Sequence, residues 1–433
     1  MTPQVTRSAT SASSIKRNSP GSETLLLLGS GDHAYRGYAL EALAARHRVL
    51  LLDYTAPTWQ LPYLAGHAVA DLRDPVAVRS AVEVLASRHP VHGVLTWDEF
   101  AAVNAAAVAR SLGLPGPDPA AVAACRNKAR SRAMLDRHHV PSPRWEPVSN
   151  LTEAQDAAGR IGYPLVLKPV SGAGSTGVVR VDQLAELAGA VDFTLRATAG
   201  QGHEGSGMVA ESYLVGPEVS VEIVSLHGRH HVVAITRKDL GAEPYFEETG
   251  HLVVAADPAA DPASRIASAA LDALGITHGV SHVEIRRTPA GPAVVEANPR
   301  MAGDLIPELV RLATGVDLVA AAADVALGRM PDLALTRAAV AAVRFLYPAA
   351  PGRVKSLSVD PDLRAEPWCE RAVVEQQPGA WVAPPPTAGL ESRLAHVVVT
   401  GASTTQCRWR LDRAAAAVHA AIVPVAHAAA GAA

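Results

Sequence analysis

The sequence of 433 residues predicts a chain of mixed α/β and α+β architecture. Between residues 24 and 112, apolar strands alternate with helices, which is typical of a parallel sheet covered by helices. Between residues 208 and 295, strand patterns dominate. A stretch rich in proline and glycine at residues 114–119 lies between the two regions and marks a domain boundary. The length is sufficient for two or three domains with proper cores.

The expected elements follow this division. In the first domain, strands are predicted at residues 24–28, 48–52 and 93–96, and helices at residues 35–46, 75–87 and 100–112. Beyond the boundary, the expected order is helical segments at 120–138 and 152–161, a strand at 164–168, a glycine loop, a second strand with a helix, the strands of 208–295, a helix at 306–314, short strands from about residue 335, and an alanine-rich helix at 411–422.

Composition excludes several classes of protein. Lysine and arginine total 39 against 42 acidic residues, so no broad basic surface for nucleic acid is indicated. Cys125, Cys369 and Cys407 show no metal-ligand spacing, as expected for free thiols in a reducing cytoplasm. Residues 1–22 are polar and are expected to form a disordered tail rather than a signal peptide. No apolar run approaches the roughly 18–20 residues that cross a bilayer. We therefore expect a cytoplasmic protein without nucleic-acid or membrane partners.

Two carboxylates and an amide come together near the end of the strand-rich region. In an extended strand, Glu296 and Asn298 point to the same face, and Glu284 can join them from a neighbouring strand. Hard oxygen donors of this kind suit Mg²⁺ held together with the phosphates of a nucleotide. Arg300 follows directly as a cation beside that metal.

Two segments fit a glycine-rich phosphate-binding pattern. Residues 29–34 follow a strand and Asp53 ends the next one, which is close to a dinucleotide fingerprint. The plain strand–turn–helix of a Rossmann-like domain explains this segment about as well. Residues 172–177 return into a strand instead of opening a helix, which predicts a hairpin flap. Its backbone N–H groups can wrap phosphate oxygens, while Lys168 at the end of the preceding strand supplies charge.

A strand at residues 208–214 runs into a short connector that suits adenine recognition. Connectors of this kind bind adenine through backbone groups, with a carboxylate nearby for the exocyclic amine or the ribose hydroxyls. Glu211 and Glu218 fit these roles. Glu218, Ser220 and Glu222 share one face of the following strand, and together they favour a site over an exposed strand face.

In this order, the pieces resemble the ATP-grasp superfamily. The resemblance is carried by Lys128, the Lys168 strand with its flap, residues 211–218, Glu284 and residues 296–300. The chain looks most like the carboxylate–amine ligases that include bacterial L-amino-acid (dipeptide-forming) ligases, and the similarity covers nearly everything from residue 25 onward.

The resemblance implies a Rossmann-like N-terminal domain followed by an ATP-grasp fold of two α+β subdomains with a strand-rich C-terminal extension. The expected parts are a tail (1–22), the N-terminal domain (23–118), a small subdomain with the flap (119–205), a large subdomain (206–334), and an extension that completes the large subdomain (335–433).

The family's roles are expected at the matching positions. The residues expected to bind ATP are Lys128, Lys168, Gly174, Ser175, Glu211, Tyr213, Leu214 and Glu218. Glu284, Glu296 and Asn298 would bind Mg²⁺, with Mn²⁺ as a substitute. The catalytic candidates are Lys168 and Arg300, and Arg300 would neutralise the transferred phosphoryl group.

Residues 245–251 resemble a segment that lines the substrate pocket of amino-acid ligases. Glu248 could anchor an ammonium group, and His251 a carboxylate or the reacting amine. Because the chain has 17 histidines, a surface-loop position for His251 is the alternative.

The segment after Arg300 is a second place where substrate could bind. Backbone N–H groups around Gly303 could form an anion cradle, and Asp304 could bind a substrate amine. Some dipeptide ligases carry a bulky aromatic residue around this position, so Asp304 favours a polar or charged first substrate. In the N-terminal domain, Asp98 fits either a ligand site at the sheet edge or a helix N-cap.

The implied function is an ATP-dependent ligase that activates an amino-acid carboxylate as an acyl phosphate and joins it to an amine, most simply a second amino acid. Its partners would be small-molecule substrates, and homodimers are common among the proteins it resembles. Three alternatives remain open: an ATP-grasp ligase or carboxylase component of primary metabolism, an NAD(P)-dependent oxidoreductase that uses residues 29–34, and a protein that binds MgATP without chemistry.

Overall fold

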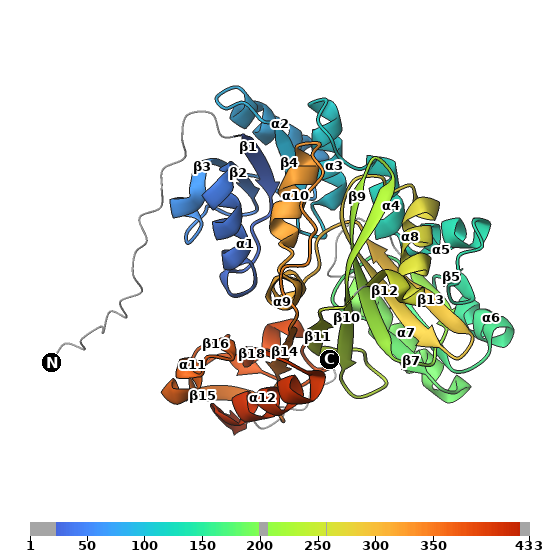
Figure 1. The fold of residues 1–433 in the computed structure, drawn as a ribbon. Helices are drawn as coiled ribbons and strands as arrows, with labels where there is room; N and C mark the ends of the chain where they lie inside the picture. The colour runs from blue at the N-terminus through green and yellow to red at the C-terminus, as the bar shows by residue number, and fades with distance from the viewer. Residues whose placement is uncertain (1–22, 199–206, 257, 425–433) are drawn as a thin grey trace.

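The computed structural model describes residues 23–198, 207–256 and 258–424, and these residues form four β-sheets with helices packed around them (Figure 1). The predicted tail at residues 1–22 lies outside the described residues. None of the helices in the described part of the chain has the length and apolar character needed to cross a membrane.

The N-terminal domain is a parallel sheet of order β3-β2-β1-β4 with helices on both faces. Its elements are β1 (Thr24–Leu28), α1 (His33–Arg46), β2 (Arg48–Asp53), β3 (Leu64–Val69), α2 (Pro75–Ala86), β4 (Gly93–Thr96) and α3 (Ala102–Ser111). Leu25 and Leu27 pack towards α1, whereas Leu26 and Leu28 pack towards α2 and α3. A strand buried on both faces reads as a continuous apolar run, as β1 does. The predicted strands and helices of this domain are confirmed; β3, a half-exposed edge strand, was missed.

Helix α10 (Leu318–Ala326) returns to this first sheet from far along the chain. It packs against α1 and β4, and Leu318 and Val325 share a core with Leu25 (Figure 1). This helix was not predicted from the sequence. It joins the N-terminal domain to the rest of the molecule through a buried apolar interface.

The helical segment predicted at residues 120–138 is two helices. Helix α4 (Pro119–Arg126) ends before Asn127, and α5 (Lys128–Arg137) begins after it. The Asn127 side chain accepts a hydrogen bond from the backbone N–H of Arg130, which is an N-cap and explains the break.

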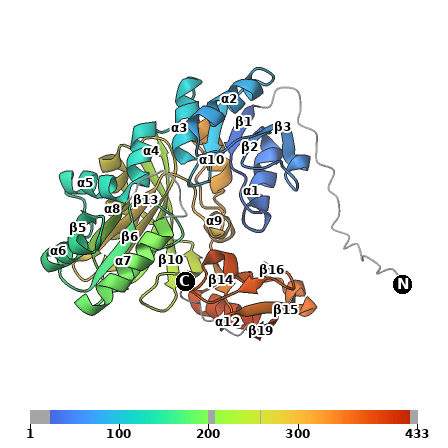
Figure 2. The same cartoon turned by 180° about the vertical axis from the view of Figure 1, so that it is seen from behind.

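A small antiparallel sheet of order β5-β8-β6-β7 follows, backed by α6 and α7 (Figure 2). Its elements are β5 (Trp145–Val148), α6 (Leu151–Ile161), β6 (Leu165–Pro169), β7 (Val179–Val181), α7 (Leu184–Thr198) and β8 (Met208–Ser212). The glycine flap connects β6 to β7, which pair as an antiparallel hairpin as predicted. Strand β8 belongs to this sheet although it lies beyond residue 206, where the sequence analysis placed the start of the large subdomain.

The large sheet has eight strands in the order β13-β12-β9-β10-β11-β14-β18-β16. They are β9 (Glu218–Leu226), β10 (Arg229–Leu240), β11 (Glu248–Val254), β12 (Gly279–Thr288), β13 (Gly291–Asn298), β14 (Val340–Leu346), β16 (Cys369–Val374) and β18 (Ala395–Gly401). Helix α8 (Pro262–Leu274) packs on one face and α9 (Ile306–Thr314) on the other. The last three strands come from the C-terminal region, so one continuous sheet runs from the candidate metal residues into the C-terminal extension.

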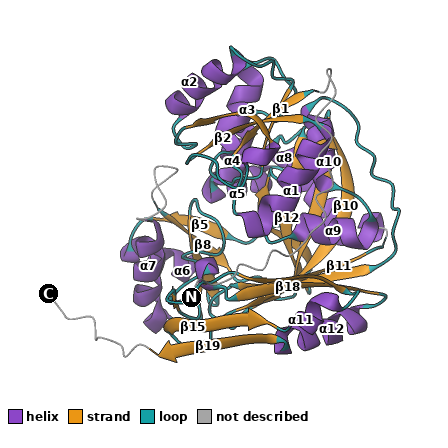
Figure 3. Cartoon of the chain, turned by 90° about the vertical axis from the view of Figure 1, so that its left-hand side faces the viewer, coloured by secondary structure: helices purple, strands orange, loops and turns teal. Residues whose placement is uncertain are grey.

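The C-terminal region adds a three-stranded sheet below β18, with α11 (Pro361–Ala365) and α12 (Thr404–Ala416) beside it (Figure 3). Its strands are β15 (Gly352–Val359), β17 (Trp381–Val382) and β19 (Val418–Pro424). The predicted helix at 411–422 is therefore wrong in its second half: α12 ends at Ala416, and β19 pairs with β15 along its length. Alanine favours a helix locally, but Val418, Ile422 and Val423 suit the pairing that β15 offers, and tertiary context overrides propensity here.

Candidate active site

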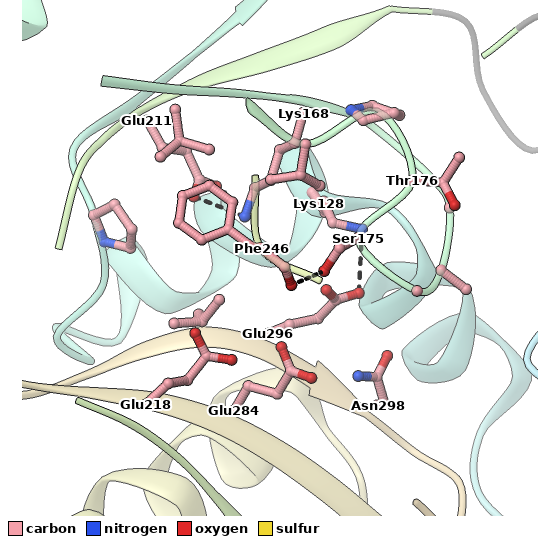
Figure 4. Close-up of a pocket in the computed structure, with 18 of the residues that line it drawn as sticks. Lys128, Lys168, Ser175, Thr176, Glu211, Glu218, Phe246, Glu284, Glu296 and Asn298 are labelled. Carbon is pink, nitrogen blue, oxygen red and sulfur yellow. Dashed lines mark hydrogen bonds and ion pairs between the residues drawn. The ribbon is translucent and has the colours of Figure 1, made fainter. Parts of the chain in front are cut away.

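A pocket lies between the small sheet with its flap and one end of the large sheet (Figure 4). It encloses about 980 Å³, including its open mouth. Thirteen of the predicted site residues line it: Lys128, Lys168, Gly174, Ser175, Glu211, Tyr213, Leu214, Glu218, Glu248, Glu284, Glu296, Asn298 and Arg300. His251, Gly303 and Asp304 are not among the residues that line it. The volume is in the range of nucleotide-sized sites.

The floor of the pocket is formed by the ends of β12 and β13. Glu284 pairs with Glu296 across the two strands, and His282 pairs with Asn298, so the three predicted metal ligands lie on neighbouring positions of one sheet face. In Figure 4, Glu284, Glu296 and Asn298 point up into the pocket. Two carboxylates and an amide oxygen are the donor set that Mg²⁺ prefers, so these residues fit the predicted ion.

A buried ion pair supports this floor from behind. Glu222 is fully buried and accepts hydrogen bonds from Ser220 at 2.7 Å and from His282 at 3.0 Å. His282 Nε2 in turn lies 3.3 Å from Glu284. Burial alone would lower the pKa of His282, but Glu222 and Glu284 outweigh it and raise the pKa to about 9. Glu222 and Ser220 therefore orient a residue beside the floor rather than face the pocket.

Lys238 on β10 lies among three carboxylates, and the sequence analysis missed it. Its Nζ is 2.5 Å from Glu248, 2.8 Å from Glu284 and 2.9 Å from Glu218. Burial would lower the pKa of Lys238, but the three glutamates raise it well above its usual value. The side chain is therefore a cation at neutral pH that balances the acidic floor. In the sequence, Lys238 is marked only by its position on a strand between the predicted site residues Glu218 and Glu248.

The roof of the pocket carries the two predicted phosphate lysines. Lys128 Nζ is 3.2 Å from Glu296, and Lys168 Nζ is 2.7 Å from Glu211 (Figure 4). Glu211 is 3% exposed, and both its oxygens are engaged, because Arg132 donates to each of them at 2.8 and 3.1 Å. In this arrangement, Glu211 fixes Lys168 and Arg132, which is different from the predicted contact with adenine or ribose.

The flap is closed over the pocket. Ser175 donates to the carbonyl oxygen of Phe246 at 3.0 Å, which joins the flap to the loop before β11 (Figure 4). Gly174 adopts φ +61°, and a Cβ there would lie 2.9 Å from Leu390 Cδ1 of the C-terminal region. The flap tip thus contacts two segments distant in sequence.

The end of the pocket where adenine is predicted is lined by Tyr213, Leu214 and Phe246. The guanidinium of Arg286 lies 5.8 Å from the ring of Tyr213 and 5.7 Å from that of Phe246. Glu218 accepts from Arg286 at 2.9 Å, so this predicted ribose ligand is paired with two cations, Lys238 and Arg286. Aromatic faces beside a cation suit a stacked base.

Arg300 is held by the N-terminal domain. Its Nε donates to Glu99, which also lines the pocket. Its Nη1 donates to the carbonyl of Met301 at 3.1 Å. Arg36 on α1 donates to the carbonyl of Ala302 at 2.9 Å. Two contacts from the first domain therefore fix the segment that contains the predicted catalytic arginine.

The predicted substrate residues form a buried chain of charges. His251 is fully buried, and its Nε2 lies 3.2 Å from Glu248 and 3.5 Å from Asp304. The surface-loop alternative for His251 is therefore wrong. Burial would lower the pKa of His251, but these two carboxylates raise it. Glu248 faces the pocket with one oxygen on Lys238 and the other on His251.

Asp304 is paired with an arginine that the sequence analysis did not consider. Arg393, 1% exposed, donates to both oxygens of Asp304 at 2.7 Å and lies 3.6 Å from the centre of the Phe345 ring. Burial would raise the pKa of Asp304, but Arg393 holds it well below its usual value. Asp304 is therefore paired through both oxygens with Arg393, and its contact with a substrate amine stays a prediction.

The first glycine motif has a packing role. Asp53 accepts from the backbone N–H and the hydroxyl of Ser30, and its other oxygen accepts from Tyr54, so it is not free for a ribose. A Cβ on Gly29 would lie 2.7 Å from that of Asp98, and one on Gly31 would lie 2.8 Å from Cγ of Arg36. The two glycines thus allow the side chains of Asp98 and Arg36 to pack closely against this turn. A packing role for the glycines and the engaged carboxylate of Asp53 argue against the oxidoreductase alternative.

The Asp98 side chain caps the turn that precedes α3. Its carboxylate accepts from the backbone N–H groups of Phe100 at 2.7 Å and Ala101 at 3.1 Å, at the turn that opens α3. Asp98 thus caps the turn that precedes α3, whereas the N-cap residue of the helix itself is Ala101, so the predicted N-cap is displaced by three residues.

Comparison with known proteins agrees with this architecture. Family models match residues 161–308 as an ATP-grasp domain, residues 40–116 as an ATP-grasp N-terminal domain and residues 344–423 as an L-amino acid ligase C-terminal domain 2. The chain is similar to the solved L-amino acid ligase from Bacillus licheniformis, with a TM-score of 0.80 and 23% identity over 94% of this chain and all of the other.

Two curated relatives match part of the chain. An uncharacterized protein, y4rH, of Sinorhizobium fredii is 32% identical over 59% of this chain and 53% of its own length. Carnosine synthase 1 of Gallus gallus is 33% identical over 60% of this chain and 30% of its own length. The chain thus spans about half of the first relative and less than a third of the second.

Proposed function

We propose that this chain, which belongs to the ATP-grasp superfamily, is an ATP-dependent carboxylate–amine ligase that joins two amino acids. The carbon–nitrogen bond would form through an acyl phosphate, with release of ADP and phosphate. The observation that carries the proposal is the pair of facing charged layers in one pocket: lysines and a closed glycine flap above, and paired carboxylates below.

The two layers suit a nucleotide triphosphate between them. Lys128 and Lys168 would contact phosphate oxygens from above, and the backbone N–H groups around Gly174 would surround them. Glu284, Glu296 and Asn298 would hold Mg²⁺, which would neutralise phosphate charge; Mn²⁺ would substitute. The connector at Tyr213 and Leu214 would hold adenine.

The chemistry would proceed in two displacements. An oxygen of the substrate carboxylate attacks the γ-phosphorus, the bond to the β–γ bridging oxygen breaks, and ADP leaves. The amine nitrogen then attacks the acyl carbon, phosphate leaves, and the nitrogen loses a proton. Arg300 would stabilise charge on the transferring group by position and electrostatics. Because water would hydrolyse the acyl phosphate, the closed flap protects it.

The substrate assignment rests on the acidic residue that faces the pocket and on the relatives. Glu248 lines the pocket beside the phosphate end and suits the ammonium group of an amino acid. A relative named as a carnosine synthase and the C-terminal domain described for L-amino acid ligases support amino acids as substrates.

The test is ADP release across a matrix of amino-acid pairs, with mass spectrometry of the product. We expect release that needs both amino acids, a product mass equal to the two acids less water, and loss of both in Lys168→Ala, Glu296→Ala and Arg300→Ala. Full activity of Glu296→Ala would contradict the metal assignment. ADP release that needs neither amino acid would favour the primary-metabolism alternative, and tight nucleotide binding without turnover would favour the binding-only one.

A further inference from the structure

Glu99 is a buried carboxylate of the N-terminal domain that reaches the pocket. Its side chain is 9% exposed and lines the pocket beside Arg300. Oε2 accepts from Nε of Arg300, and Oε1 accepts from Nη1 of Arg126. Burial would raise the pKa of Glu99, but the two guanidinium groups lower it. An anion is therefore present between the two arginines at neutral pH.

The segment that carries Glu99 is fixed to the N-terminal domain by several hydrogen bonds. Thr96 donates from Oγ1 to the carbonyl of Leu28 at 2.7 Å, and Trp97 donates from its indole N–H to the carbonyl of Ser30 at 3.0 Å. Directly before Glu99, Asp98 caps the turn into α3. A carboxylate held by its backbone in this way can orient a flexible arginine, because its own position costs little entropy to maintain.

The contacts of Arg300 determine which of its nitrogens is available. Nε is used by Glu99 and Nη1 by the carbonyl of Met301. Among the described residues, Nη2 of Arg300 has no hydrogen-bond partner, and the side chain lines the pocket. A guanidinium is planar, so fixing two of its nitrogens also fixes the direction of the third.

A second contact links Glu99 towards the flap. Arg126 donates from the same Nη1 to the carbonyl of Gly172 at 3.5 Å, at the start of the flap, and stacks 5.2 Å from the Phe100 ring. Glu99 thus lies between the arginine expected at the phosphoryl group and the arginine that contacts the base of the flap.

We propose that Glu99 is a positioning residue through which the N-terminal domain orients Arg300, so that its Nη2 meets the γ-phosphoryl group. The inference rests on the proposed function, because it takes the pocket to bind ATP. Glu99 itself would touch neither nucleotide nor acyl phosphate. Arg300 and Arg126 are both cations and repel each other. The negative charge of Glu99 between them offsets this repulsion and keeps Arg300 in place.

The first experiment separates positioning from support of the fold. We expect Glu99→Gln, which keeps the shape and loses the charge, to reduce kcat by about 10²-fold, the effect of a small misplacement of a reacting group. KM for ATP should change less than threefold, and Glu99→Asp should recover part of kcat. The matched control is Glu308→Gln, which removes another buried carboxylate paired with an arginine, Arg311, outside the pocket. It should keep kcat.

A double-mutant cycle and a binding measurement complete the test. If Glu99 acts through Arg300, Glu99→Gln should add little to the loss caused by Arg300→Lys. Calorimetry should find that wild type and Glu308→Gln prefer a non-hydrolysable MgATP analogue over MgADP, whereas Glu99→Gln and Arg300→Gln lose that preference with unchanged MgADP affinity. Unchanged preference and unchanged kcat in Glu99→Gln would overturn the inference.

The binding arm needs no turnover, so the two proposals fail separately. A wild-type protein that binds both nucleotides but forms no amide would refute the proposed ligase while the preference still decides the role of Glu99. Equal affinity of the wild type for the two nucleotides would refute the contact between Arg300 and the γ-phosphoryl group, and with it the inference.

Discussion

At the scale of single residues, the pocket is defined by how each charge is neutralised. Lys238 balances three glutamates, and Glu211 balances Lys168 and Arg132. Removing one member of such a buried set leaves an uncompensated charge, which costs about 3–5 kcal/mol. A nucleotide that binds together with its metal would bring negative phosphate charge and positive metal charge into the pocket at once. The charge balance of the pocket would therefore change little on binding.

Glu247 is a buried carboxylate with one oxygen that has no hydrogen-bond partner among the described residues. The residue is 9% exposed, and the oxygen without a partner is Oε2. Burial raises its pKa to about 7 from an ordinary value of 4.5. The folded state therefore binds a proton that the unfolded state releases, so this contribution to stability is complete below pH 4.5 and is lost as pH rises to about 7.

We accordingly predict that Glu247→Gln is more stable than wild type at pH 8 and gains no such advantage at pH 4.5. The gain should be at most a few kcal/mol, since each pKa unit corresponds to about 1.4 kcal/mol. Urea denaturation of both proteins across this pH range measures it. A difference in the free energy of unfolding that does not change with pH would contradict the assignment to Glu247.

At the scale of elements, the flap connects the chemistry to the C-terminal region. The hairpin of β6 and β7 is local, but its tip contacts Phe246 and Leu390 from two other parts of the chain. Lids of this kind commonly set turnover rates, because they exclude water and complete the site. The contacts of the tip should therefore affect kcat more than the stability of the fold.

Gly174→Ala tests this. The new Cβ would lie 2.9 Å from Leu390, at a φ of +61° that side chains avoid, so we expect at least a tenfold loss of kcat/KM for ATP with a Tm close to wild type. Adding Leu390→Ala should recover the steric part of the loss. Gly159→Ala is the matched control: it lies in α6 with nothing within 4 Å of the new Cβ, and it should raise stability by about 0.5–1 kcal/mol and leave kinetics unchanged. Wild-type kinetics in Gly174→Ala would show that the flap does not close this way during turnover.

At the scale of the whole molecule, two buried ion pairs join the domains, one at the pocket and one outside its lining. Glu99 joins the N-terminal domain to Arg300, and Arg393 joins the C-terminal region to Asp304. Arg393 also contacts Tyr35 of α1 and Tyr347 near β14, so it touches three regions of the chain. These contacts make the region around Asp304 an interface between the N-terminal domain, the large sheet and the C-terminal region. The homodimer stays a prediction, which light scattering after size exclusion would check.

Arg393→Met should lower the free energy of unfolding by about 3–5 kcal/mol, because Asp304 would be left as an unpaired buried charge. The double variant Arg393→Met with Asp304→Leu should recover much of this loss, since replacing both partners with apolar groups removes the unpaired charge. Chemical denaturation measures both. An equally large loss in the double variant would mean that Arg393 acts through its contact with Phe345 rather than through the ion pair.

Much of the pocket could be predicted because its motifs are local. Glu284, Glu296 and Asn298 come from two strands that pair as a hairpin, so strand alternation alone places their side chains on one face. The flap likewise lies between paired neighbouring strands. Missed elements such as β3 and α10 carry weaker local patterns and are stabilised by packing against distant segments, and β19 took its form from its partner β15.

The sequence by itself therefore determined the ATP-grasp architecture, the acidic floor, the lysine roof and the flap, because the order and alternation of residues along single strands and hairpins encode them. Only the tertiary structure decided which ion pairs hold these groups. Glu99 lies 201 positions from Arg300, Asp304 lies 89 from Arg393, and Arg132 lies 79 from Glu211. Long charged side chains can reach many partners, and the one each takes depends on how the domains pack. That packing paired Asp304 with Arg393 and placed Glu99 beside Arg300, the residue that Glu99 is proposed to orient.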